Sequence, residues 1–148
     1  MKLWSRLILL VHIGLATFFI LSGNWILIFL VTLAPHLARW LVIFTHQPQH
    51  IGMQGNITDW RKNTRTYLAG PFIRFLYWNM NYHVEHHMFA SVPFYNLPAL
   101  RKSIQGDIPL APRGLIATWR EIFLFLKKNR SDPGFFIKPE FPETAILR

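Results

Sequence analysis

Two apolar runs at the start of the chain restrict its possible folds more than any other feature. The first extends from Leu7 to Leu21, and the second from Trp25 to Phe44. A helix needs about 20 residues to cross the hydrocarbon core of a bilayer. The second run has this length, and the first reaches it if the helix begins near Leu3. Because Ser22-Gly23-Asn24 between them is typical of a turn, the sequence predicts a transmembrane helical hairpin over residues 1–44.

The positive charges around the hairpin predict its orientation. Lys2 and Arg6 precede it, Arg61, Lys62 and Arg65 follow it, and the turn carries none. By the positive-inside rule, both ends are expected in the cytoplasm, at the endoplasmic reticulum of a eukaryote or the inner membrane of a bacterium. A signal peptide is the alternative for the first run, but no small-residue cleavage site is evident and a second apolar run follows directly.

Pro35 and Arg39 interrupt the later part of the second run. Proline removes a backbone hydrogen bond, so one interpretation is a helix that kinks at Pro35. The other is a helix that extends beyond the hydrocarbon, so that Arg39 reaches the interface.

Composition supports a membrane location. The 148 residues are 51% apolar and include 13 Phe and 6 Trp, side chains that membrane interfaces use. The 16 Lys and Arg outnumber the 7 Asp and Glu, for a net charge of +9. These cations flank apolar segments, so the expected partner is the anionic surface of a lipid bilayer and not nucleic acid. Cysteine is absent, which excludes disulfides and thiolate metal ligands.

After residue 44 the chain becomes more polar, and an all-α fold is expected throughout. Residues 45–130 are expected to form a cytoplasmic helical segment, and residues 131–148 an irregular tail. Within the segment, one helix is expected between 68 and 81, starting at Gly70-Pro71, and a short one from Pro98 to 104.

Residues 113–130 are predicted to form an amphipathic helix. Five apolar residues recur there at helical spacing: Leu115, Trp119, Ile122, Phe123 and Leu126. This stripe fits a helix on the membrane surface and equally a helix packed against the cytoplasmic segment, because periodicity does not separate the two.

The run His83-Val84-Glu85-His86-His87 is the most informative motif. On a helix, its histidines occupy positions i, i+3 and i+4 and share one face. Imidazole nitrogen suits iron, zinc, copper and nickel, whereas three adjacent imidazoles have little structural use, because each needs hydrogen-bond partners. The spacing therefore indicates a metal site, with a polar helix face carrying incidental histidines as the alternative.

A second pair, His46 and His50, follows the second apolar run at a spacing of i, i+4. Alone, this spacing fits a metal site and a set of interfacial histidines equally well. With both hairpin ends in the cytoplasm, the pair emerges on the same side of the membrane as His83. The two clusters are then expected to meet at one site near the bilayer surface.

Other catalytic motifs do not fit. In the zinc metalloprotease helix, Glu directly follows the first His, whereas Glu85 is two residues after His83 and points to another side. Glu85 is therefore interpreted as a group that supports the ligands or as a surface residue. The sequence has no nucleophile elbow and no glycine-rich phosphate loop.

The segment from Asn81 to Phe89, followed by Pro93 and Leu97-Pro98, resembles the integral-membrane fatty-acid desaturase family. It is similar to the third histidine box of that family, with the usual Asn-Tyr lead and Phe-containing continuation. Residues 76–80, Leu-Tyr-Trp-Asn-Met, extend the match. The order of parts is also similar, namely a hairpin, a cytoplasmic segment with a further histidine, and the third box, so that the resemblance covers residues 1–105.

The resemblance implies two irons, held by histidines of three boxes and by an additional residue ahead of the third. His83, His86 and His87 match the third box, His50 matches the additional position, and His46 lies where some members place an amide that reaches the metal through water. Nothing here resembles the first two boxes. The chain is therefore expected to be incomplete alone, as a fragment, a truncated gene product or half of a complementing pair.

The resemblance further implies oxygen-dependent introduction of a double bond into an acyl lipid or acyl thioester, with dioxygen as co-substrate. The candidates to contact the acyl chain are Phe72, Phe75, Trp78 and Phe89, with core packing as the alternative. A cytochrome-b5-like or ferredoxin-like protein is the expected electron donor, because a basic surface suits an acidic partner. Two alternatives remain: a related di-iron hydroxylase of lipids, carotenoids or alkanes, and a non-catalytic remnant.

Overall fold

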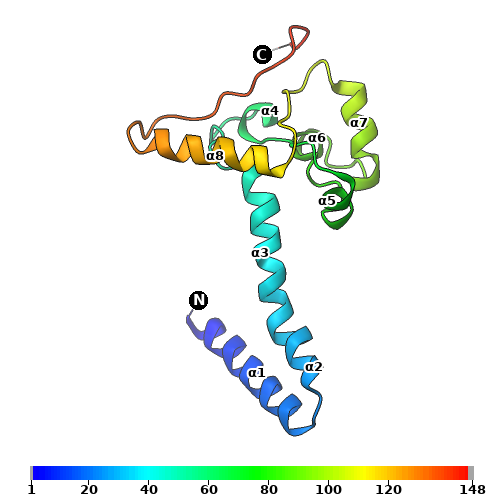
Figure 1. Cartoon of the computed structure of the whole chain (residues 1–148), viewed down its shortest axis with the longest axis vertical. Coiled ribbons are helices and arrows are strands. Elements are labelled where there is room, and N and C mark those ends of the chain that lie inside the picture. Colours follow the sequence, from blue (N-terminus) through cyan, green and yellow to red (C-terminus); the bar gives the residue numbers. More distant parts are fainter. Residues whose placement is uncertain (1, 147–148) are drawn as a thin grey trace. The chain divides into compact units, whose positions relative to one another are not determined.

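The computed structural model describes residues 2–146, without the side chain of Lys2, and the regular elements in this range are all helices. Among these residues, β-structure is limited to one isolated parallel bridge, between Leu68 and Arg113. The predicted all-α class is thus confirmed. The chain divides into two compact units, Met1–Ile43 and Phe44–Arg148, and Figure 1 shows the helices of each.

The first unit is a helical hairpin whose bounds the structure gives as follows: α1 (Lys2–Leu21), α2 (Trp25–Leu27), η1 (Ile28–Leu33) and α3 (Ala34–His46). The last residues of α3 belong to the second unit. Two helical stretches, Leu3–Leu21 and Trp25–Gln49, are long and apolar enough to cross a membrane.

The turn between α1 and α2 places a glycine in the left-handed region. Gly23 has a φ of 72°. Its N–H donates to the carbonyl of Ile20 at 3.1 Å, and the N–H of Asn24 donates to the carbonyl of Phe19 at 2.9 Å. These two bonds satisfy carbonyls that the end of α1 would otherwise leave free. The predicted turn at residues 22–24 is confirmed.

Pro35 lies in the first turn of α3, directly after η1, which is a π-helical segment. At the end of η1, the N–H of Ala34 donates to the carbonyl of Phe29, five residues earlier. Proline has no N–H, and its ring collides with the carbonyl four residues before it, so a wider preceding turn relieves the conflict. The structure thus has a π-helical turn directly before Pro35, and the helix continues to His46.

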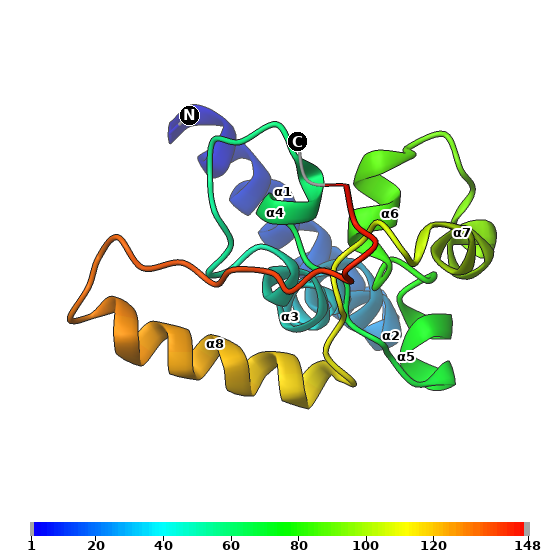
Figure 2. The ribbon, with the colours of Figure 1, turned by 90° about the horizontal axis from the view of Figure 1, so that it is seen from above.

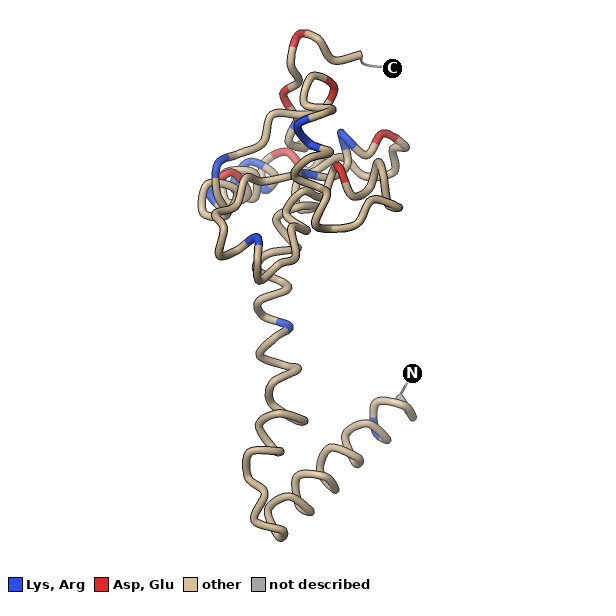
Figure 3. Tube along the Cα trace, turned by 90° about the vertical axis from the view of Figure 1, so that its right-hand side faces the viewer, with Lys and Arg blue, Asp and Glu red and all other residues tan. Residues whose placement is uncertain are grey.

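Apolar side chains are exposed over the first unit. Leu21 is 83% exposed, Trp4 70% and Trp25 66%. Charged residues gather instead in the second unit, as the coloured trace of the described residues shows (Figure 3). Moving apolar surface from water into hydrocarbon is favourable by about 25 cal/mol per Å². The environment that this unit fits is therefore the interior of a bilayer.

The second unit consists of short helices joined by loops: η2 (Gln47–Gln49), α4 (Trp60–Asn63), α5 (Pro71–Leu76), α6 (His83–Met88), η3 (Phe94–Asn96), α7 (Leu97–Ile104) and α8 (Leu115–Asn129). α6 contacts both α4 and α7 and lies between them when viewed from above (Figure 2). It therefore occupies an inner position among the helices of the unit.

The helix predicted between residues 68 and 81 is confirmed only in part. Gly70 caps α5 and Pro71 begins it, as expected, but the helix ends at Leu76. Trp78 and Asn79 have φ values of 50° and 53°. An L-residue pays about 1–2 kcal/mol for the left-handed conformation, and no right-handed helix accommodates it, so this turn ends α5.

α8 packs with a face that is displaced from the predicted stripe. Leu115, Thr118 and Ile122 are buried, whereas Phe123 and Leu126 are 63% and 43% exposed. Thr118 fits the buried face because its hydroxyl donates to a backbone carbonyl within the same helix turn. The helix therefore packs on its own unit and leaves part of its apolar surface uncovered.

The chain after α8 is attached to the second unit by backbone hydrogen bonds. The N–H of Ile137 donates to the carbonyl of Gly52 at 2.7 Å, and the N–H of Leu110 donates to the carbonyl of Glu140 at 2.8 Å. No helix or strand forms in the described residues of this tail. Its order comes from these attachments to earlier loops.

Candidate metal centre

Histidines from two distant parts of the second unit converge. His46 ends α3, His50 follows η2, and His83 and His87 lie on α6. The Nε2 atoms of His83 and His50 are 2.8 Å apart, and those of His83 and His87 are 3.0 Å apart. Ring nitrogens of His46, His50 and His83 lie within 4.8 Å of one another. The structure thus brings together the two clusters that the sequence separates by 33 residues.

The three histidines of α6 share one face, as their spacing predicts, but they do not lie at the same depth. The ring centroids of His83 and His87 are 4.5 Å apart. That of His86 is 6.1 Å from His83 and 5.8 Å from His87. His83 is buried, and the other two are half-buried. His83 is therefore the centre of the cluster and His86 its rim.

Burial keeps the central imidazoles neutral. Burial, followed by the nearby rings of His87 and His50, lowers the pKa of His83 to about 2. The pKa values of His50 and His87 are also lowered, by burial first and then by neighbouring histidines. A neutral imidazole presents one nitrogen lone pair, which is the form that binds a metal.

The hydrogen-bonding capacity of His83 does not match its surroundings. A ring nitrogen offers either one proton or one lone pair, yet the Nε2 of His83 faces two other Nε2 atoms, those of His50 and His87. Its Nδ1 is buried and has no partner among the described residues. A cation shared by the facing nitrogens would satisfy all of them, so the donor set fits a metal of the kind that imidazole prefers.

Two polar side chains, the half-buried Tyr77 and the buried Gln49, support His46. The hydroxyl of Tyr77 lies 3.3 Å from the Nδ1 of His46 and donates to the Oε1 of Gln49 at 2.9 Å. Gln49, which is fully buried, donates in turn to the carbonyl of Met80 at 2.6 Å. Burial raises the pKa of Tyr77 to about 12. A hydroxyl that stays protonated fixes the orientation of the neighbouring imidazole ring.

Glu85 is buried completely, so of the two interpretations of this residue the surface one is wrong. Its carboxylate accepts the hydroxyl of Thr66 at 2.5 Å and forms an ion pair with Arg101 on α7. The Thr66 oxygen also accepts the N–H of Val84 at 3.1 Å. The back of α6 is thereby tied to two other segments. Sequence reasoning did not identify Arg101, although a buried carboxylate needs such a partner.

Trp60, at the start of α4, stacks on the ring of His87, with centroids 4.6 Å apart and an angle of 26° between the planes. Sequence reasoning missed this residue as well. The distance along the chain between Trp60 and His87 leaves no local signal. The aromatic face of Trp60 restricts the rotation of the His87 ring, which is only half-buried.

Asn81, which precedes the histidine run, forms hydrogen bonds that position the start of α6. It is fully buried, and its Nδ2 donates to the carbonyl of Tyr67 at 2.9 Å, while the N–H of Tyr67 donates to the carbonyl of Asn81 at 3.2 Å. The hydroxyl of Tyr67 reaches the carbonyl of Thr45, just before His46. These bonds set the entry to α6 relative to the end of α3.

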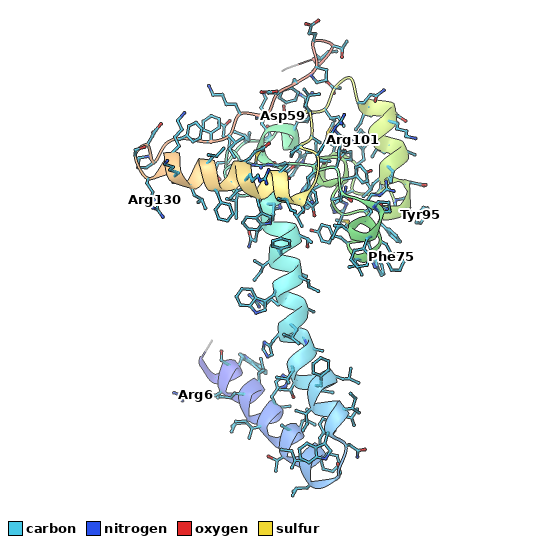
Figure 4. The ribbon with its side chains drawn as sticks, viewed as in Figure 1. Arg6, Asp59, Phe75, Tyr95, Arg101 and Arg130 are labelled. Atoms are coloured by element: carbon cyan, nitrogen blue, oxygen red, sulfur yellow. The ribbon has the colours of Figure 1, made fainter. Side chains whose placement is uncertain are left out.

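The four residues expected to contact an acyl chain lie on the surface of the unit. Phe72 is 71% exposed, Phe75 79%, Trp78 64% and Phe89 40%. In Figure 4, Phe75 projects outward from α5. None of the four lines the cavity of about 490 Å³, whose walls come from α8, the tail and residues 64–66. These four aromatic side chains are exposed and do not line this cavity.

The model of the fatty acid desaturase family matches residues 1–119. This range contains both apolar stretches and all five histidines of the centre, and it ends within α8. No curated protein and no solved structure has a significant match to the chain.

Proposed function

The chain belongs to the fatty acid desaturase family, and we propose that its histidine cluster is part of a di-iron site for oxygen-dependent desaturation of an acyl chain. The observation that carries this proposal is the convergence of ring nitrogens from His46, His50, His83 and His87. Hydrogen bonds among these nitrogens alone do not satisfy all of them. Iron is a metal that an all-imidazole set accommodates.

The residues that we propose as ligands are His46, His50, His83, His86 and His87. When bound, iron supplies the oxidising power that removes two hydrogens from an unactivated chain with dioxygen as co-substrate. The protein holds the imidazoles neutral and in place. Tyr77 and Gln49 orient the ring of His46, Trp60 restrains that of His87, and Glu85 fixes α6 from behind.

Five imidazoles are fewer than two irons require, because each iron takes about four to six ligands. We therefore propose that further ligands come from another segment, in the same or a different polypeptide. His86 and His87 at the rim of the cluster are half-buried, so that part of each ring is accessible to such a segment. Activity is then a property of the assembled site and not of these residues alone.

We propose that Phe72, Phe75, Trp78 and Phe89 contact the acyl chain. They follow or precede the ligand helix closely in sequence, and their exposed apolar surface suits a substrate that has no polar groups along its length. The proposed substrates are acyl lipids or acyl thioesters. The net charge of +9 favours an acidic electron donor of the cytochrome-b5-like or ferredoxin-like kind.

For the arrangement in the membrane, we propose that the chain crosses it twice. The two apolar stretches support this topology by their length. By the positive-inside rule, both ends of the hairpin then lie in the cytoplasm, because positive charges flank it at Arg6 and at Arg61, Lys62 and Arg65.

Anaerobic titration of the purified full chain with Fe(II) tests the metal site. His83→Ala is expected to weaken iron binding by more than about tenfold, because it removes the central donor. His36→Ala changes an exposed histidine outside the cluster and serves as the control. Equal iron affinity in the wild type and His83→Ala, with an unchanged near-ultraviolet circular dichroism spectrum, would contradict the proposed metal site.

Lipid analysis tests the reaction. The chain is expressed in a lipid-producing host, with and without an added segment that carries further histidine clusters. A new double bond is expected only when both are present and only with His83 intact. A new hydroxyl group without a double bond would instead identify a related hydroxylase, and no new product would contradict the enzymatic proposal.

A further inference from the structure

α8 carries a second apolar face in addition to the one that packs on its unit. The outer strip of α8, as we name it, consists of Ile116, Trp119, Phe123 and Leu126. These residues recur at i, i+3, i+7 and i+10 and therefore share one side of the helix. Ile116 is 70% exposed and Phe123 63%. The strip is offset from the buried residues by one position, or about 100° of rotation.

The outer strip contacts the end of the second apolar stretch, which we propose spans the membrane. The indole Nε1 of Trp119 donates to the carbonyl of Phe44 at 3.0 Å, and the two rings stack with centroids 5.7 Å apart. Both residues belong to the second unit. Phe44 lies five residues before the end of the apolar stretch Trp25–Gln49. With the proposed membrane topology, the contact holds the strip at the level where that stretch leaves the hydrocarbon.

Cations border the outer strip on the side away from the packed face. Arg120 and Lys127 each follow a strip residue by one position, and both are exposed. Long cationic side chains beside an apolar strip can lay their methylene groups on it and extend the charge to lipid headgroups. Tryptophan, the residue that makes the contact to Phe44, is itself enriched at membrane interfaces.

From these three observations we infer that α8 lies along the membrane surface, with the outer strip immersed at the boundary between headgroups and acyl chains. The occupant of this face is the bilayer, because the strip is continuous with a membrane-spanning stretch through Trp119 and Phe44. The buried face then holds the metal-bearing unit against the same surface. The inference rests on the proposed membrane crossing of residues 25–49 and not on iron or on the reaction.

Site-directed spin labelling tests the inference directly, because the chain contains no cysteine. A nitroxide is attached at Phe123→Cys in the full chain, reconstituted in vesicles of phosphatidylcholine and phosphatidylglycerol. Its collision rates with oxygen, which concentrates in lipid, and with a water-soluble nickel chelate are compared. The label at 123 is expected to favour oxygen severalfold.

Leu124→Cys is the matched control. Leu124 is the next residue, is also apolar, and is 69% exposed, but it lies off the strip. Its label is expected to favour the nickel chelate. Ile116→Cys, two turns from Phe123 on the same strip, is expected to behave as the label at 123 does, because a helix parallel to the surface immerses both ends.

Three results would overturn the inference. One is access to the nickel chelate at 123 equal to that at 124. Another is a label at 116 in water while that at 123 is in lipid, which indicates a helix tilted out of the surface. The last is a label at 123 that collides with neither reagent and is immobilised, which identifies a protein partner on this face.

Discussion

The two units of the chain differ in where they put their polar groups. In the hairpin, helices expose apolar side chains and the described residues bury little more than Phe19. In the second unit, Gln49, Asn81 and Glu85 are fully buried beside apolar residues. The apolar surface of the hairpin therefore fits an apolar environment such as the interior of a bilayer, whereas the second unit depends on hydrogen bonds and ion pairs among its internal polar groups. Changes to single polar partners are expected to affect the second unit most.

The largest effect is expected from Arg101→Met. It leaves the carboxylate of Glu85 buried without its ion-pair partner, and breaking a buried pair in this way costs about 3–5 kcal/mol. Denaturant unfolding followed by near-ultraviolet circular dichroism measures the loss. Lys102→Met, at the exposed neighbouring position on α7, should change stability by less than about 0.5 kcal/mol. Similar losses in both variants would contradict the polar pairing described for the second unit.

A smaller effect, on metal binding, is expected from Tyr77→Phe. The hydroxyl that is lost lies beside the Nδ1 of His46 and donates to Gln49, so the ring of His46 becomes free to reorient. Loss of such an outer partner weakens metal binding by about tenfold or more. Fe(II) titration provides the measurement. Tyr95→Phe, at an exposed tyrosine, should leave iron affinity unchanged, and equal affinity in both variants would refute the supporting role.

In the hairpin, Gly23→Ala is expected to cost about 1 kcal/mol. The glycine has a φ of 72°, and a Cβ there meets no atom within 4 Å, so the cost arises from the backbone conformation and not from a clash. Unfolding in mixed detergent micelles, followed by far-ultraviolet circular dichroism, detects it. Gly23→Asn should cost less, because asparagine tolerates the left-handed region. A larger loss for Asn than for Ala would contradict this reason.

The smallest effect is expected from Asp59→Asn, and it depends on pH. Hydrogen bonding and the charge of Arg61 lower the pKa of Asp59 below its ordinary value of 3.8. A lowered pKa in the folded state stabilises the protein above the unfolded value, and this contribution disappears as the pH falls through the folded value. The variant should therefore be less stable by up to about 1 kcal/mol at neutral pH.

Unfolding of the wild type and Asp59→Asn at several pH values provides the measurement. The difference should shrink below about pH 3.8, the ordinary pKa of the carboxyl group. Asp132→Asn, at an exposed aspartate in the loop after α8, is the control and should show no such trend. A stability difference between the wild type and Asp59→Asn that grows as the pH falls would contradict this prediction.

The elements that follow from local pattern were predictable. The length of the apolar runs predicted the hairpin, and Ser22-Gly23-Asn24 predicted its turn. The spacing of His83, His86 and His87 predicted that they share one helix face. Each depends on residues within a few positions of one another, where helical geometry fixes the relation. The end of α5 was not predictable in this way. It depends on left-handed backbone at Trp78 and Asn79, residues whose type does not require that conformation.

The sequence by itself determined that this chain carries two apolar helices and a helix with three histidines on one face. Only the tertiary structure decided which groups surround those histidines. The contacts of His83 with His50, of His87 with Trp60 and of Glu85 with Arg101 join segments that are distant along the chain. Their geometry results from packing of the whole second unit, and no short-range periodicity encodes it. The same packing decided which face of α8 is buried and left its outer strip exposed.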